Sequence, residues 1–208
     1  MTFDRPITYL ITPGNATPEK FDINKAEILA TVRRAVDCGL TLIQLREKQL
    51  TAKQLFELAA EAAVLTQKSG TRLLVNDRAD IAAAAGADGV HLTSTSLPPD
   101  LIRQAFGDEI LIGVSTHSAN EVAAARQGGA DFAVFGPVFA VPDKPSPVGV
   151  EVLRSVCAIA GDFPVLSLGG IDLGNYRSAL DAGAAGIASI RMFGGADLGD
   201  VMRKITNE

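Results

Sequence analysis

The sequence has few cysteines, no excess of positive charge and no long apolar run. Cys38 and Cys157 are the only two cysteines, and they lie far apart. This excludes both a disulfide framework and a paired-cysteine zinc site, so we interpret both as core thiols. The formal net charge is −5. Without a basic stripe, neither nucleic acid nor an anionic membrane is an expected partner.

No apolar run reaches the roughly 18 residues that a membrane span requires. The first apolar segment, Ile7 to Ile11, is also too short for the core of a secretion signal. We therefore expect a cytoplasmic protein. A chain of 208 residues with 47% hydrophobic and 21% charged residues is sufficient for a sizeable core.

The sequence also lacks a serine, histidine and acid arrangement with hydrolase spacing, and neither cysteine has a partner that would make it a nucleophile. His91 and His117 are the only histidines. Either could simply satisfy a backbone hydrogen bond. His117 is the stronger candidate for ligand contact because it follows Ser115 at the end of a predicted strand.

A short phrase built around glycine and small residues recurs along the chain. Its copies occupy residues 38–43, 86–90, 129–134 and 183–187. In each copy a glycine suited to ending a helix precedes an apolar run suited to a strand buried on both faces. The repeats therefore predict alternating helices and parallel strands.

Eight strands are predicted, at residues 8–11, 41–45, 72–75, 89–92, 111–114, 132–135, 164–167 and 186–190. Helix starts are indicated where a capping side chain precedes Glu or Gln by three residues: Thr51 with Gln54, Ser118 with Glu121, and Asn24 with Glu27. Eight strands in this length favour a single α/β domain over residues 1–208, a closed (βα)8 TIM barrel. A doubly wound open sheet is the alternative.

Catalytic groups of such a barrel follow the carboxyl ends of its strands. Gln44, Arg46 and Lys48 alternate, so on an extended strand their side chains share one face. Two cations and an amide there could bind a diphosphate and stabilise a departing phosphate group. Alternatively, the cations form surface ion pairs with Glu47 or its neighbours.

Two further strand ends carry candidate groups. Asp77 follows Asn76 and could ligate magnesium, or it could cap a helix that begins near Ala79. Gly169-Gly170, before a helix predicted to start near Asp172, allows backbone N–H groups to approach an anion. A plain turn is the alternative for this pair.

The remaining candidates after strands five, six and eight are Ser115, Thr116, His117, Lys144, Ser189 and Arg191. The motifs that combine these positions are Gln44-Leu45-Arg46-Glu47-Lys48, Val75-Asn76-Asp77-Arg78, residues 86–92, Gly113-Val114-Ser115-Thr116-His117, residues 129–131, residues 136–139 and Leu168-Gly169-Gly170-Ile171. In this order, over essentially the whole chain, they resemble the thiamine-phosphate synthase family and its paralogue, the thiazole tautomerase (TenI-like) family.

The resemblance implies that hydroxymethylpyrimidine diphosphate loses pyrophosphate with the help of Mg²⁺, and that a thiazole phosphate nitrogen captures the pyrimidine cation. The residues implied for the diphosphate and the reacting centre are Gln44, Arg46, Lys48, Asn76, Ser115 and Lys144. The thiazole phosphate is implied to bind Gly169, Gly170, Ser189, Ile190 and Arg191. Asp77 is the implied metal ligand.

The chain departs from the synthase pattern in three places. Ser96 stands where the family has a second metal-binding aspartate, and serine is a poor replacement for an anionic ligand, so we expect weaker Mg²⁺ binding. The family pattern has threonines on both sides of the position that Pro142 occupies here. This chain has Val141 and Asp143 in their place, directly before Lys144. Arg191 replaces a phosphate-contacting serine, and could bind phosphate, fill the thiazole phosphate pocket or pair with Asp143 outside it.

Two other functions therefore stay open. A thiazole tautomerase needs proton transfer rather than diphosphate departure, and His117 would be its candidate proton carrier. A barrel that binds phosphorylated ligands without turnover is the other. The sequence allows a homo-oligomer but does not predict one.

Overall fold

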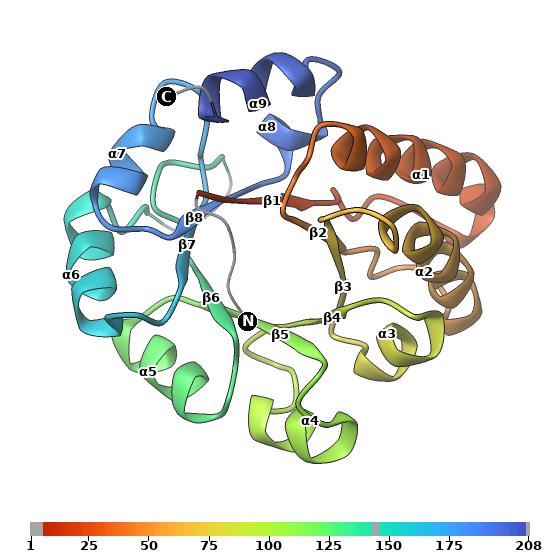
Figure 1. Cartoon of the computed structure of the whole chain (residues 1–208), viewed down its shortest axis with the longest axis horizontal. Coiled ribbons are helices and arrows are strands. Elements are labelled where there is room, and N and C mark those ends of the chain that lie inside the picture. The colour runs from red at the N-terminus through yellow and green to blue at the C-terminus, as the bar shows by residue number, and fades with distance from the viewer. Residues whose placement is uncertain (1–5, 143–145, 207–208) are drawn as a thin grey trace.

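The structure is a computed structural model that describes residues 6–142 and 146–206. Its parallel strands close into a barrel in chain order (Figure 1). The strands are β1 (Ile7–Ile11), β2 (Leu42–Leu45), β3 (Arg72–Asn76), β4 (Gly89–Leu92), β5 (Leu111–Thr116), β6 (Phe132–Phe135), β7 (Val165–Leu168) and β8 (Gly186–Ser189). The barrel closes where β8 pairs with β1. The predicted (βα)8 fold is confirmed, and the open sheet is wrong.

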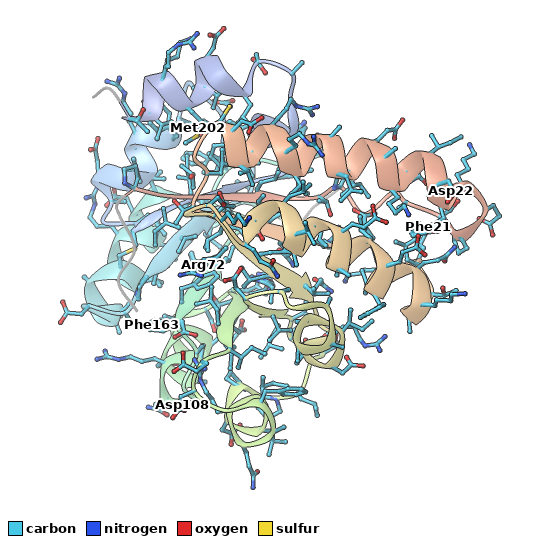
Figure 2. The ribbon with its side chains drawn as sticks, turned by 45° about the vertical axis from the view of Figure 1, so that its right-hand side comes forward. Phe21, Asp22, Arg72, Asp108, Phe163 and Met202 are labelled. Carbon is cyan, nitrogen blue, oxygen red and sulfur yellow. The ribbon has the colours of Figure 1, made fainter. Side chains whose placement is uncertain are left out.

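Helices surround the strands on the outside of the barrel. They are η1 (Pro18–Lys20), α1 (Phe21–Asp37), α2 (Ala52–Thr66), α3 (Ala79–Ala85), α4 (Pro99–Phe106), α5 (Ala119–Gln127), α6 (Val150–Ala160), α7 (Tyr176–Asp181), α8 (Arg191–Gly194) and α9 (Leu198–Thr206). Figure 2 shows α1 and α2 side by side, where Lys25 pairs with Glu57 and Glu61. No helix within the described ranges has the length and apolar character needed to span a bilayer.

Two of the three predicted helix starts are confirmed. Thr51 and Gln54 form a complete capping box, and the Ser118 hydroxyl accepts from the Glu121 N–H. The Asn24 prediction is wrong. The 3₁₀ turn η1 runs directly into α1 at Phe21, so Asn24 already lies in the helix and its side chain accepts from the Thr17 N–H at 3.1 Å.

Inward-facing side chains change character along the barrel axis. Towards the amino ends of the strands they are apolar and include Ile7, Leu42 and Leu74. Towards the carboxyl ends, buried polar side chains appear at Gln44, Asn76 and His91. Because strand residues alternate between faces, the inward position two residues after Leu42 is Gln44, and the one after Leu74 is Asn76. The barrel therefore has an apolar floor and a polar upper layer.

The repeated phrase has a structural role beyond ending helices. Its last polar residue accepts a backbone N–H from the neighbouring strand, so that Asp88 binds the N–H of Leu73 and Asp131 that of Ile112. Thr41 accepts the N–H of Thr8 in the same way. These bonds tie β2, β4 and β6 to the strands before them at the amino end of the barrel.

Replacing Asp131 by alanine should destabilise the fold. The change leaves the Ile112 N–H without its 2.7 Å acceptor and removes the ion pair with Arg103. We expect a loss of about 1–3 kcal/mol in the free energy of unfolding, measured by urea denaturation. Asp162→Ala, at an exposed position in the loop before β7, is the matched control and should change it little. Equal losses of unfolding free energy in the two variants would contradict a stabilising role of the Asp131 side chain.

Candidate active site

A cavity of about 580 Å³ opens at the carboxyl ends of the strands. The sequence-predicted residues that line it are Gln44, Arg46, Asn76, Ser115, His117, Gly169, Gly170, Ser189, Ile190 and Arg191. They come from segments up to 147 residues apart in the chain (191 − 44) and meet only because the barrel closes. Lys144 and Asp143 lie outside the described residues.

Gln44 and Asn76 form a buried amide pair on adjacent strands. The Gln44 Nε2 donates to the Asn76 Oδ1 at 2.9 Å, and both side chains are almost fully buried. The Gln44 Oε1 has no hydrogen-bond partner within the described part of the chain. A buried acceptor without a hydrogen bond costs folding free energy unless a ligand donates to it. The amide pair therefore leaves one unsatisfied oxygen, on a residue that lines the cavity.

Arg46 reaches the cavity from the segment that follows β2. Its backbone N–H donates to the Thr12 hydroxyl at 2.8 Å, which fixes the start of the loop. Its guanidinium lies beside Gly14, where a Cβ atom would approach Nη1 to 2.8 Å. Gly14 has φ +79°, so glycine provides both the left-handed turn and the space for the guanidinium.

The neighbouring residues differ from the sequence-based expectation. β2 ends at Leu45, so the alternation does not extend to Lys48, which lies exposed in a turn and does not line the cavity. The proposed surface ion pair with Glu47 is also wrong. Glu47 is buried, and its carboxylate accepts the N–H groups of Gly14 and Ala16 in the loop after β1.

Asp77 projects from the end of β3 in a left-handed conformation, with φ +64°. It does not cap α3, because the N-cap residue is Arg78 and no side-chain cap bond is formed; that alternative is wrong. Instead, the Ser96 hydroxyl donates a short hydrogen bond to the Asp77 Oδ1. Within residues 6–142 and 146–206, no cluster of three or more His, Cys, Asp and Glu side chains could hold a metal.

His91, which the sequence marked as the weaker of the two histidine candidates, lies in the site. Its ring lines the cavity and joins Tyr9 to Ser115: Nδ1 lies 3.1 Å from the Tyr9 hydroxyl, and Nε2 lies 2.9 Å from the Ser115 hydroxyl. Burial, and then the nearby Arg46 cation, lower the pKa of His91 to about 3. The ring is therefore neutral near pH 7. Its inward position in β4, in register with Asn76, was the available signal.

His117 follows β5 at the mouth of the cavity. Its Nδ1 lies 2.6 Å from the Gly136 carbonyl oxygen, which only accepts, so Nδ1 carries a proton and donates it. In the neutral ring, Nε2 is consequently unprotonated. The histidine is positioned by this bond and by its backbone N–H, which donates to Glu121 at 2.7 Å.

Gly169 and Gly170 both have positive φ, at +97° and +64°. A Cβ atom on Gly170 would lie 2.6 Å from the Ala140 carbonyl oxygen, so only glycine fits against the loop after β6. The helix expected near Asp172 begins later, at Tyr176, because Asp172 and Asn175 form turns with neighbouring backbone N–H groups. The Asn175 amide also donates to the Gly170 carbonyl at 2.8 Å.

The chain after β8 completes this side of the cavity. Ser189 is buried and its hydroxyl accepts from the Met192 N–H at 3.2 Å, so the chain turns immediately into α8. Arg191 is exposed and lines the cavity. Among the described residues it has no carboxylate at ion-pair distance. A cation and two glycines in left-handed conformation thus lie together at the ends of β7 and β8.

The fold and cavity define a (βα)8-barrel enzyme with its site at the carboxyl ends of the strands. Residues 8–193 match the thiamine monophosphate synthase family, and several curated relatives exceed 30% identity over most of their length. The chain belongs to this family, which places it among the transferases of thiamine biosynthesis.

Individual relatives cover nearly the whole chain. A Geobacter sulfurreducens protein, provisionally named thiamine-phosphate synthase, is 45% identical over 88% of this chain and 84% of its own length. The thiamine-phosphate synthase of Caldicellulosiruptor bescii is 38% identical over 91% and 86%. The solved structure of thiamine phosphate pyrophosphorylase from Pyrococcus furiosus superimposes with a TM-score of 0.81 at 30% identity, over 96% and 93% of the two chains.

Gly170→Ala should abolish anion binding at this end of the cavity. Gly161→Ala is the matched control, since Gly161 has φ +61° but a Cβ atom added there would meet nothing within 4 Å. Both variants place an alanine at a positive φ, so both incur backbone strain. In thermal unfolding scans, millimolar inorganic phosphate should raise the Tm of the wild type and of Gly161→Ala, but not that of Gly170→Ala. A phosphate-induced shift retained in Gly170→Ala would overturn this assignment.

Proposed function

We propose that this enzyme joins hydroxymethylpyrimidine diphosphate to thiazole phosphate and releases pyrophosphate. The observation that supports the proposal is one cavity lined by Arg46 and the amide pair on one side, and by Gly170 with the chain after β8 on the other. Family membership supplies the pair of substrates that such a cavity would accommodate. Two phosphorylated molecules held together in this way would react as if in one molecule.

In the reaction, the bond between the pyrimidine methylene carbon and the diphosphate oxygen breaks, and the oxygen keeps the electron pair. The thiazole nitrogen then forms a bond to that carbon. Negative charge grows on the leaving diphosphate, so fixed donors and cations aimed at it lower the barrier. We assign this role to Arg46, Ser115, Lys48 and Lys144, with Lys48 acting from its exposed turn.

The amide pair has a different assignment. Gln44 and Asn76 hold each other in place through the 2.9 Å bond, so the Gln44 Oε1 has a fixed direction. A planar, nitrogen-rich ring offers donors to such an oxygen. We propose that this pair orients the pyrimidine, because orientation by buried amides discriminates against rings that lack the matching donor.

The thiazole phosphate is assigned to Gly169, Gly170, Ser189, Ile190 and Arg191. Backbone N–H groups of the glycines and of the chain after β8 suit phosphate oxygens, and the loops after strands seven and eight are the usual phosphate site of this fold. Arg191 adds a planar cation that can bind two phosphate oxygens at once.

Magnesium is proposed to bind together with the diphosphate, at Asp77. Mg²⁺ sites in proteins commonly use one or two carboxylates with substrate phosphates, so the single carboxylate of Asp77, the residue after the cavity-lining Asn76, fits the weaker of these arrangements. When bound, the ion would neutralise charge on the departing diphosphate. Ser96 occupies one oxygen of Asp77 and offers no charge of its own.

Thiazole tautomerisation is the second candidate, favoured by one observation. The Nδ1–H of His117 donates to Gly136, which leaves Nε2 of the neutral ring as a proton acceptor at the cavity mouth.

We further propose that the whole chain acts as one barrel domain in the cytoplasm. Free thiols at Cys38 and Cys157 support the reducing compartment.

Turnover assays with purified substrates separate these functions. With both substrates and Mg²⁺, thiamine phosphate and pyrophosphate should form in equal amounts. Arg46→Ala should lower kcat by about 10²–10³-fold, because a donor to the leaving group is lost. Aromatisation of the thiazole tautomer without any coupled product would instead establish the tautomerase, and binding without either reaction would overturn both.

Restoring the missing carboxylate should strengthen metal binding. Ser96→Asp places a second anionic ligand next to Asp77, so the Mg²⁺ concentration for half-maximal activity should fall by about tenfold. Ser94→Asp, an exposed position two residues away, controls for the added charge and should leave that concentration unchanged. No difference between the two variants would remove Asp77 as the metal ligand.

A further inference from the structure

A buried hydrogen-bonded chain runs from the barrel interior to the cavity. It begins at the Tyr9 hydroxyl in β1, passes through both nitrogens of His91 in β4, and ends at the Ser115 hydroxyl in β5. Tyr9 and His91 are almost completely buried, whereas Ser115 is partly exposed and lines the cavity. The direction in which the protons point along this chain decides what Ser115 can do to a ligand.

The ring of His91 is held in one orientation. Its centroid lies 5.7 Å from that of Tyr9 and 6.3 Å from that of Phe132. Gly113 makes room for it, since a Cβ atom there would lie 2.9 Å from the His91 Nδ1. The two nitrogens therefore keep their separate partners and do not exchange them by ring rotation.

Tyr9 sets the direction. Within the described residues its hydroxyl has a single hydrogen-bond partner, the His91 Nδ1. Burial raises the pKa of Tyr9 well above its ordinary value, so the phenol keeps its proton. If Nδ1 donated to Tyr9, the phenol proton would be buried without an acceptor, which is costly. Tyr9 therefore donates, and Nδ1 accepts.

The other proton positions in this hydrogen-bonded chain follow from the chemistry of a neutral imidazole. With Nδ1 unprotonated, the proton resides on Nε2, because a neutral ring has one donor and one acceptor nitrogen. The His91 Nε2–H therefore donates to the Ser115 oxygen at 2.9 Å. The low pKa of His91 supports the neutral ring. The serine proton is left without an acceptor among the described residues.

We infer that Tyr9 and His91 are positioning residues that make Ser115 an obligatory hydrogen-bond donor to an oxygen of the ligand bound in the cavity. His91 cannot accept the serine proton, so Ser115 is not activated as a nucleophile. Instead, the hydroxyl is preset to donate to an anionic oxygen, and no internal bond must break when the ligand binds. The inference rests on the proposed function for the identity of that ligand, a diphosphate.

Nitrogen-15 NMR of the histidines tests the proton positions without any substrate. The chain has only two histidines, and their neutral rings are expected to be opposite tautomers: protonated at Nε2 in His91 and at Nδ1 in His117. Two-bond ¹H–¹⁵N correlations at mildly alkaline pH distinguish them, and loss of one set in His91→Gln assigns the peaks. An Nδ1-protonated His91 would overturn the inference.

Substitutions test whether the hydrogen-bonded chain from Tyr9 to Ser115 affects the reaction. Tyr9→Phe removes the donor to Nδ1, so the tautomer should change and kcat should fall by about tenfold, with KM little changed. Thr71→Val is the matched control, because it also deletes a buried hydroxyl, which donates to the Leu40 carbonyl at 2.7 Å before β3, away from the cavity. It should keep the His91 tautomer and wild-type kcat.

A pair of changes at His91 separates positioning from packing. Glutamine retains one acceptor and one donor and should preserve most of the activity, whereas leucine removes both and should lower kcat by about 10–100-fold. Circular dichroism and urea denaturation verify that each variant is folded. Equal activity of the two folded variants, or an unchanged tautomer and kcat in Tyr9→Phe, would overturn the inference.

The outcomes also distinguish this inference from the proposed function. Wild-type protein that forms no thiamine phosphate but carries the Nε2-protonated His91 contradicts the proposed function and supports the proton arrangement. Wild-type protein that forms thiamine phosphate with His91 protonated at Nδ1 supports the proposed function and contradicts the proton arrangement.

Discussion

The pairing of β8 with β1 is the contact on which the rest of the structure depends. Once it forms, every second residue of each strand faces a closed interior that has no access to water from the sides. Apolar residues fill the lower layers, and most polar groups of the upper layer bond to one another. The amide pair of Gln44 and Asn76 and the chain through His91 are the results of that constraint.

The two sides of the cavity that are proposed to bind anions use different kinds of donor. Around β7 and β8 the backbone offers the donors, and close packing against Pro137 and Phe139 requires glycine at positions 169 and 170. Around β2 to β5 side chains offer them, and each is held by a neighbouring group. Backbone groups suit a phosphate that stays bound throughout, whereas oriented side chains suit a group whose charge changes during the reaction.

Ser96 and Asp77 lie in the segments after β4 and β3, and neither belongs to the residues that line the cavity. The serine hydroxyl contacts the carboxylate, so the two positions remain neighbours although only one is anionic. Val141, by contrast, lines the cavity with an apolar side chain. Neither Ser96 nor Val141 adds a charge to this end of the barrel.

The sequence by itself determined the number and order of strands, the glycine positions and the polar strand ends, because these depend on local periodicity and backbone preference. Tertiary structure decided which polar groups converge. Lys48 is exposed in a turn because β2 ends at Leu45, whereas Glu47 is buried and accepts backbone N–H groups of the loop after β1. Tyr9 meets His91 across 82 residues of chain. Such contacts are set by barrel register and by the burial of unpaired donors, neither of which any short segment encodes.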